Sequence, residues 1–214
     1  MVRKTKEDAE LTRQRIIDAA KEVFLKRGVS RSTIEHIALQ AEVTRGAVYW
    51  HFKSKTEIFH AIRDRVFLPL IDRMDDTLAI ASQTDDIDAL TQIENSMSDT
   101  INELNENIEM RQIYEIMMIK CEYVDEFATV LQQILNNCSN ITEKIQLAYE
   151  RAQAQNILVV AHTPRALALD THLFFSGLLH MWVKDADGSR FRYQAIELIQ
   201  SHISLRRKCI KTLS

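Results

Sequence analysis

The sequence is organised around residues 44–55, Thr44-Arg45-Gly46-Ala47-Val48-Tyr49-Trp50-His51-Phe52-Lys53-Ser54-Lys55. Aromatic and basic side chains are interleaved in this stretch, and it opens with a hydroxyl residue that can cap a helix. A helix that enters a DNA groove needs a side chain for a base edge, others for phosphates, and apolar residues that hold it from behind. The stretch contains all three kinds, so it predicts a DNA-reading helix.

A short break at residues 42–44 separates this helix from another short one. Ser32-Thr33-Ile34-Glu35 matches a capping box, which predicts a helix over about 33–41, and Thr44 can cap the helix that follows. Two short helices joined by three residues form a helix-turn-helix. The apolar residues expected to fix their angle are Ile34, Ile37, Ala38, Val43, Val48 and Phe52.

Helices are also predicted on both sides of this motif. Apolar residues recur at helical spacing over 8–27, and Gly28 is placed as the stop. Ser54-Lys55-Thr56-Glu57 is a second capping box, which starts a long helix to about residue 81. Pro69 lies inside that helix and predicts a kink over residues 66–69.

Beyond residue 81 the sequence keeps helical periodicity. Asp85 or Asp86 is expected to cap a fifth helix to about 104, followed by helices over about 108–122 and 126–155. Thr163-Pro164 starts an eighth helix that is apolar nearly all round, so we expect both its sides to be covered. A ninth is predicted over about 190–207. The expected fold is all-α with nine helices.

Composition argues against several classes of protein. Only 4 Gly and 2 Pro occur in 214 residues, so the sequence has few of the turn residues that separate β-strands. Cys121, Cys138 and Cys209 form no CxxC pair and are expected to be reduced thiols. The histidines show no pairing at i,i+4, and no spacing provides a nucleophile with a base. We therefore expect no metal, no cofactor and no enzymatic activity.

Charge is divided unevenly along the chain. Residues 1–65 hold 14 basic and 9 acidic residues, a net charge of +5, which leaves −8 for residues 66–214. This asymmetry suggests a small head that meets a polyanion and a larger body that does not. No apolar run is long enough for a membrane span, and the first residues lack a signal peptide. The expected location is cytoplasmic, with no membrane contact.

Residues 9–60 resemble the DNA-binding head of the Tet-repressor family, through residues 16–24, Gly28, residues 33–38 and residues 43–55. The start at residues 3–7 and the form Thr-Arg-Gly-Ala-Val-Tyr-Trp-His-Phe are similar to the AcrR-type branch, whose members repress multidrug efflux-pump operons. One residue departs from the family pattern: Glu42 stands in the turn where glycine is usual. A positive φ there would cost roughly 1 kcal/mol.

The resemblance implies a helix-turn-helix DNA-binding domain over 1–55, and a ligand-binding and dimerisation domain over 56–214. The fourth helix, 55–81, would be the connecting lever. It also implies a homodimer that binds pseudo-palindromic double-stranded operator DNA, because two heads read half-sites about one helical turn apart. A small lipophilic or drug-like effector bound in the body would release the repressor from its operator.

Roles in DNA binding follow from side-chain chemistry and from the resemblance. Arg45 can pair with guanine, and Gly46 lets the backbone approach the DNA. Tyr49 and His51 can contact phosphates or sugars. The other expected DNA contacts are Arg13, Thr33, Thr44, Lys53 and Lys55. Trp50 and Phe52 are expected to pack inside the protein.

In the body, residues on the central helices offer deformable apolar walls with a few polar points. The expected ligand-binding residues are Met97, Thr100, Tyr114, Met117, Met118, Cys138, Ile141, Ile145, His172, Phe175, Ser176 and Leu179. The last two long helices, residues 165–207, are implied to pair with a second copy. The expected dimer interface consists of Leu173, Leu178, Met181, Trp182, Ile196, Ile199 and Ile203.

Two alternatives stay open at the level of sequence. One is a regulator of the same family that controls a metabolic operon unrelated to efflux. The other is a helical adaptor that binds proteins through its apolar eighth helix, which would leave residues 44–55 unexplained.

Overall fold

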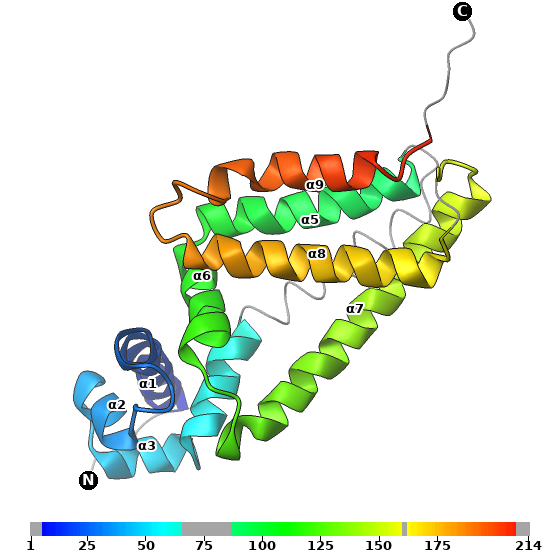
Figure 1. The fold of residues 1–214 in the computed structure, drawn as a ribbon. Helices are drawn as coiled ribbons and strands as arrows, with labels where there is room; N and C mark the ends of the chain where they lie inside the picture. Colours follow the sequence, from blue (N-terminus) through cyan, green and yellow to red (C-terminus); the bar gives the residue numbers. More distant parts are fainter. Residues whose placement is uncertain (1–5, 66–86, 160–161, 209–214) are drawn as a thin grey trace, which may run out of the picture. The chain divides into compact units, whose positions relative to one another are not determined.

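The computed structural model describes residues 6–65, 87–159 and 162–208 (Figure 1). Within these ranges every regular element is helical, apart from an isolated bridge between Leu158 and Arg207. This confirms the all-α class. Contacts divide the chain into two compact units, residues 1–68 with 108–131 and residues 69–107 with 132–214. The division differs from the predicted boundary at residue 55, because residues 108–131 pack with the N-terminal segment.

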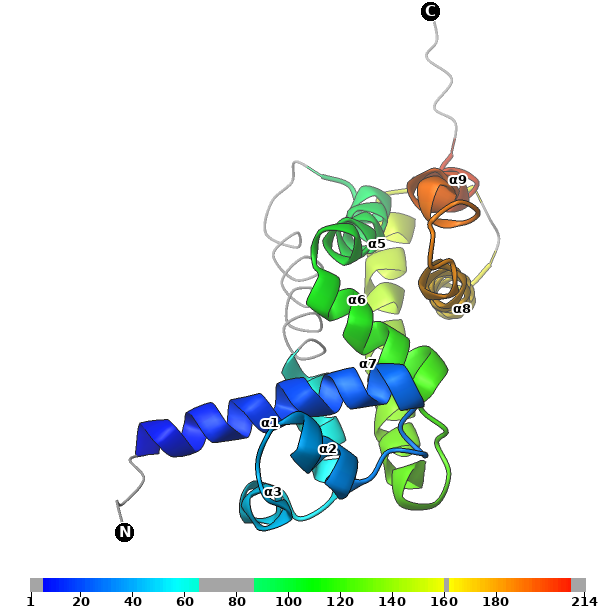
Figure 2. The ribbon, with the colours of Figure 1, turned by 90° about the vertical axis from the view of Figure 1, so that its left-hand side faces the viewer.

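The first unit contains α1 (Lys6–Arg27), α2 (Ile34–Gln40), α3 (Arg45–His51) and a helix described over residues 55–65. Helix α1 lies across α2 and α3 and contacts both (Figures 1 and 2). The fully or almost fully buried side chains include Ile16, Ala20, Phe24, Ile37, Val48, Phe52, Ile58 and Phe59. Burial of this shared apolar surface fixes the angle between α2 and α3.

Hydroxyl residues cap the helices of the first unit. Thr44 caps α3 as predicted, and the Ser54 hydroxyl accepts from the amide of Glu57 at 3.1 Å. The capping box of α2 is shifted by one residue from its expected position. Thr33 is the cap and His36 closes the box, whereas the Ser32 hydroxyl donates to the Gly28 carbonyl at 2.6 Å.

Glu42 has a φ of 53°, in the left-handed region that favours glycine. The turn therefore requires the conformation that the sequence suggests, and this chain adopts it with a side chain present.

Replacing Glu42 with glycine is expected to raise the free energy of unfolding by about 0.5–1 kcal/mol. Relief of the left-handed penalty is partly offset by the greater freedom of glycine in the unfolded chain. Urea denaturation measures the change. Glu42→Ala keeps the penalty and serves as the control, so equal stabilisation by both substitutions would contradict the explanation.

Residues 108–131 complete the first unit, and their part before α7 is residues 108–127. They form α6 (Ile108–Glu115), a π-helical turn (Ile116–Lys120) and a 3-10 turn (Asp125–Phe127). The predicted helix to residue 122 thus ends early, in a wider turn. The amide of Val29 donates to the Lys120 carbonyl at 2.8 Å, and Lys21 pairs with Glu109 at 3.0 Å. The rings of Phe59 and Phe127 meet edge to face at 5.3 Å.

The second unit contains α5 (Ala89–Glu106), most of α7 (Ala128–Ala154), α8 (Pro164–Lys184) and α9 (Ala195–Ser204). Helices α5 and α9 lie side by side, and α8 packs on α9 (Figure 1). Thr163 caps α8 as predicted, whereas the cap of α5 is Asp88. Asp85 and Asp86 lie outside the described residues, as do the helix beyond residue 65 and the expected kink at 66–69.

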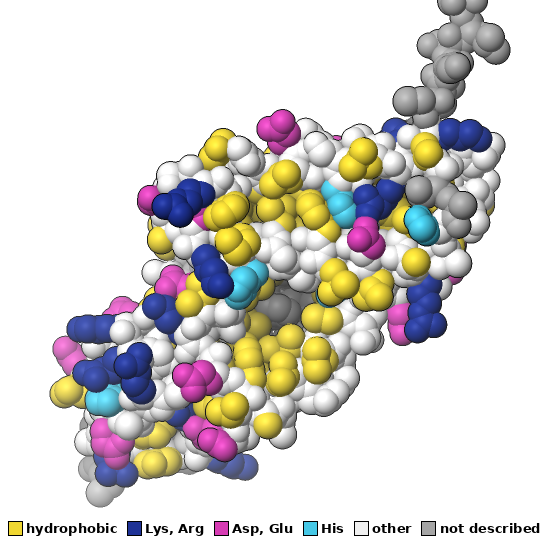
Figure 3. Space-filling model, viewed as in Figure 1, with side chains coloured by type: hydrophobic (Ala, Val, Ile, Leu, Met, Phe, Trp, Pro, Cys, Tyr) yellow, Lys and Arg dark blue, Asp and Glu magenta, His cyan; other side chains and the backbone are white. Residues whose placement is uncertain are grey.

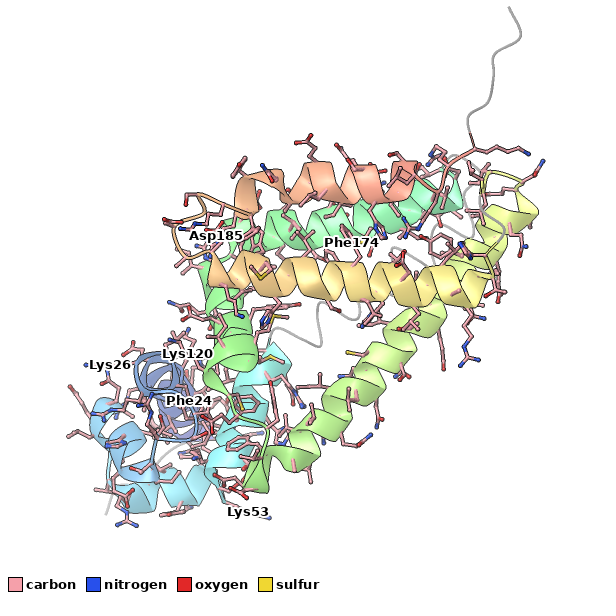
Figure 4. All side chains as sticks on the ribbon, viewed as in Figure 1. Phe24, Lys26, Lys53, Lys120, Phe174 and Asp185 are labelled. Atoms are coloured by element: carbon pink, nitrogen blue, oxygen red, sulfur yellow. The ribbon has the colours of Figure 1, made fainter. Side chains whose placement is uncertain are left out.

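The turn between α8 and α9 is held by Asp185 (Figure 4). One carboxylate oxygen accepts the amides of residues 190, 191 and 192 at 2.7–3.1 Å. Burial of the carboxyl raises its pKa, but these backbone hydrogen bonds outweigh that effect and lower the pKa of Asp185 to about 2. Because the three amides and a 3-10 turn (Arg192–Gln194) occupy this region, α9 begins at Ala195 and not at the predicted Arg190.

Helix α8 is the one helix in the described ranges long and apolar enough to cross a membrane by length and composition. Within its unit, Trp182 is fully buried, and the Thr171 hydroxyl hydrogen-bonds Tyr149 of α7 at 2.7 Å. The Arg192 guanidinium covers the Trp182 ring at 4.3 Å. These contacts bury part of α8 within its own unit.

Candidate DNA interface

Helix α3 has one buried side and one exposed side. Val48 and Phe52, one turn apart, are buried at 0% and 2% exposure. The side chain of Arg45 is 59% exposed, and Tyr49 and Trp50 are 49% and 73% exposed. Residues 45, 46, 49 and 50 of a helix share one side, since they are separated by one turn. The exposed side therefore presents a guanidinium and two aromatic rings.

Trp50 stands outside the interior, which corrects the packing role expected for it from sequence. Its ring meets the His51 ring edge to face at 4.5 Å and is otherwise largely exposed on the head. The helical period explains the difference, because positions 48 and 52 both point to the core and position 50 lies opposite them. An exposed tryptophan beside Arg45 and Tyr49 adds an amphipathic ring that can pack on sugars or bases.

The residues around the start of α3 leave room for DNA to approach the helix backbone closely. A methyl group added to Gly46 would meet only the Thr44 hydroxyl oxygen, at 3.8 Å. The Thr44 hydroxyl accepts from the Ala47 amide at 3.1 Å, so its O–H can still donate to a phosphate. The Thr33 hydroxyl likewise accepts from the His36 amide, at 3.3 Å.

Lys55 makes contacts within the first unit, and the phosphate contact expected for it stays a prediction. Its side chain is only 13% exposed, and the ammonium pairs with Glu126 at 3.1 Å. It also donates to the carbonyls of Ser30 and Ser32 at 3.5 and 3.3 Å. No local pattern around residue 55 indicates these contacts, because Glu126 is far along the chain and belongs to the 3-10 turn.

Replacing Lys55 with methionine is expected to lower the free energy of unfolding by about 1–2 kcal/mol, since the charged hydrogen bonds are lost. Lys53→Met is the matched control, because the Lys53 side chain is exposed at the end of α3 (Figure 4). It should change stability by less than about 0.5 kcal/mol. Equal losses in urea denaturation of the two variants would contradict the structural role of Lys55.

The remaining predicted DNA contacts lie at the edge of this surface. Lys53 is exposed, and its amide donates to the Glu57 carboxylate at 2.6 Å. His51 is half-buried. Arg13 lies over the Phe52 ring at 5.1 Å and within 3.8 Å of Glu10, with 39% of its side chain exposed. Each of these side chains is accessible, and their contacts with DNA stay predictions.

Most of the chain matches models of known protein families. Residues 16–62 match the family model of bacterial regulatory proteins of the tetR family. Residues 88–207 match the model of the C-terminal region of MAATS-type transcriptional repressors. The chain belongs to the Tet-repressor family. As a Tet-repressor family member it is a DNA-binding transcriptional regulator and not an enzyme.

Several relatives of this Tet-repressor family member cover nearly its whole length. The HTH-type transcriptional regulator TtgR of Pseudomonas putida is 36% identical over 86% of this chain and 85% of its own. NalD of Pseudomonas aeruginosa, the secondary repressor of the MexAB-OprM multidrug efflux pump, superposes with a TM-score of 0.83 at 28% identity, over 95% and 100% of the two chains. The structure of the SmeT–triclosan complex superposes with a TM-score of 0.75 at 29% identity, over 93% of each of the two chains.

The predicted ligand-binding residues are distributed over both units. In the second unit, Met97, Thr100, Ile145 and Leu179 are buried, and Cys138, Ile141, His172, Phe175 and Ser176 are half-buried. In the first unit, Tyr114 and Met117 are buried and Met118 is half-buried. Burial lowers the pKa of His172, so its imidazole is neutral near pH 7. That these residues line one ligand cavity stays a prediction.

The predicted dimer interface separates into core and surface residues. Trp182, Ile199 and Ile203 are fully buried within the second unit, and Leu178 is 8% exposed, so these four belong to the protomer's own core. Leu173 and Met181 are exposed, and Ile196 is half-buried. Figure 3 shows apolar side chains along the outer face of α8 and α9. The exposed large apolar residues of α8 and α9 are Leu169, Leu173, Met181 and Leu198.

Proposed function

We propose that this Tet-repressor family member is a dimeric repressor of a multidrug efflux-pump operon, acting in the cytoplasm and released by lipophilic ligands. The observation that carries the DNA-binding part is the exposed side of α3, where Arg45, Tyr49 and Trp50 stand together on a capped helix. The efflux assignment is supported by NalD and SmeT, whose solved structures are those of multidrug efflux-pump repressors.

A second copy of the chain is the proposed partner of the outer face of α8 and α9. Leu169, Leu173 and Met181 recur at intervals of one or two turns on α8, and a methyl group added to Gly177 between them would meet no atom within 4 Å. This open, apolar stripe would let a partner helix approach closely. Two copies joined here would present two heads to a pseudo-palindromic operator.

Effector control is proposed to act through residues 108–127. Besides the Val29–Lys120 hydrogen bond, Arg65 pairs with Asp18 at 2.9 Å and with Glu109 at 3.3 Å. The head and α6 are therefore expected to move together. A ligand that favours the arrangement in which the heads do not fit the operator would lower DNA affinity by its differential binding free energy.

Fluorescence anisotropy with DNA selected by the protein from a randomised pool tests both parts. Selection of a two-fold symmetric sequence is expected, and saturating triclosan should weaken its binding about 5- to 150-fold at fixed salt. Recovery of no preferred sequence would contradict the DNA-reading role. If the affinity for DNA is unchanged when triclosan is bound, the release of the repressor by ligands is contradicted, whereas the DNA-reading role is not. Derepression of metabolic genes in place of pump genes in a deletion strain would favour the non-efflux alternative.

A further inference from the structure

The guanidinium of Arg45 is held by a carboxylate on the neighbouring helix. Its Nη1 atom lies 2.9 Å from Oε1 of Glu35, which is in the first turn of α2. Both side chains are more than half exposed, at 59% and 51%, so the pair lies on the surface where α3 is open to a groove.

The carboxyl group of Glu35 carries a negative charge beside Arg45. Hydrogen bonds with its own backbone amide and with the Thr33 hydroxyl, together with the charge of Arg45, lower its pKa, so it is ionised near pH 7. The Thr33 hydroxyl is anchored in turn, because it caps α2 by accepting from His36. The carboxylate in the first turn of α2 thus meets the guanidinium of the N-terminal residue of α3.

The geometry of a guanidinium allows Arg45 to keep this contact while reading a base. Arginine carries five N–H donors in a planar fork, and a bidentate contact with guanine uses two of them. A carboxylate that occupies another donor can remain in place. Contact with a phosphate would instead swing the charge toward the backbone and bring Glu35 close to a second anion, which is unfavourable.

We propose that Glu35 is a specificity-determining residue, which orients Arg45 toward a base edge and withholds it from backbone phosphates. The inference rests on the proposed base-reading role of Arg45. Glu35 acts through Arg45 and is not expected to contact DNA. The Glu35 carboxylate therefore lowers the affinity of the protein for unrelated DNA more than its affinity for the operator.

The test compares Glu35→Gln with the unchanged protein on two duplexes, one selected by the unchanged protein from a randomised pool and one scrambled. Loss of an exposed ion pair in each head should reduce the ratio of operator to scrambled affinity by about 2- to 25-fold. Freed Arg45 should gain a phosphate contact, so the dependence of log affinity on log salt for scrambled DNA steepens by about 0.9 per head.

Glu22→Gln is the matched control, because it removes the same charge from an exposed position on α1 where the carboxylate contacts Gln40. Circular dichroism and urea denaturation confirm that both variants fold. An equal change of the affinity ratio in both variants would overturn the proposal, since only overall charge would then matter.

A double-mutant cycle with Arg45→Ala separates this inference from the function on which it rests. If Glu35 acts through Arg45, Glu35→Gln changes nothing further in the Arg45→Ala background. An undiminished effect in that background overturns the proposal. If Arg45→Ala alone leaves operator preference intact, the base-reading role of Arg45 is wrong. If Arg45→Ala abolishes the preference and Glu35→Gln preserves it, only the role of Glu35 is wrong.

Discussion

Replacing Arg45 with alanine is expected to weaken operator binding by about 1–3 kcal/mol for each head and to relax the sequence preference. Arg45 is the one arginine or lysine of α3, so no other side chain of that helix can make the same bidentate contact with guanine. Anisotropy on the selected and scrambled duplexes at one salt concentration measures both changes.

Lys53→Ala gives the contrasting result. A lysine that contacts only phosphate should weaken binding to both duplexes alike and reduce the salt slope by about 0.9 per head. A uniform loss in Arg45→Ala, matching that of Lys53→Ala, would show that Arg45 contacts the backbone and that another residue reads the bases.

Replacing Leu173 with glutamate is expected to convert the protein to a monomer and to reduce operator affinity by about 100-fold or more. Leu173 is 61% exposed on the outer face of α8, so the protomer tolerates a charge there, whereas a dimer interface would bury it without a partner. Analytical ultracentrifugation measures the oligomeric state, and anisotropy measures the affinity.

Leu147→Glu is the control for this substitution, because Leu147 is 55% exposed and belongs to α7 and not to α8 or α9. The Leu147→Glu variant should remain dimeric and bind the operator with the affinity of the unchanged protein. A dimeric Leu173→Glu protein with full affinity would place the interface elsewhere.

Local signals in the sequence predict the helical framework well. Thr44, Ser54 and Thr163 act as caps where they are expected, because a hydroxyl beside a free helix amide is a local interaction. The predicted cap of α2 is wrong by one residue. Ser32 with Glu35 and Thr33 with His36 both have the spacing of a capping box, and the structure uses the second pair. The early end of α6 in a π-helical turn has no comparable signal in the sequence.

Long-range contacts decide the residues that sequence alone does not assign. The ion pair of Lys55 with Glu126 could not be predicted, because the two residues are 71 positions apart in the sequence. Helix α8 is apolar nearly all round, so periodicity cannot separate buried Trp182 from exposed Leu173. Arg45 and Tyr49 are exposed, as the DNA contacts implied by the family resemblance require, and the helical period explains why they point away from buried Val48.

The discontinuous first unit limits how this regulator can be recombined with its relatives. A fragment ending at residue 65 would lack the Lys120 carbonyl that pairs with Val29 and the Phe127 ring that covers Phe59. A chimera that takes its reading head from one parent and its effector body from another therefore has to transplant residues 108–131 with the head. Crossover points after residue 107 and near residue 131 would keep these two contacts within one parent.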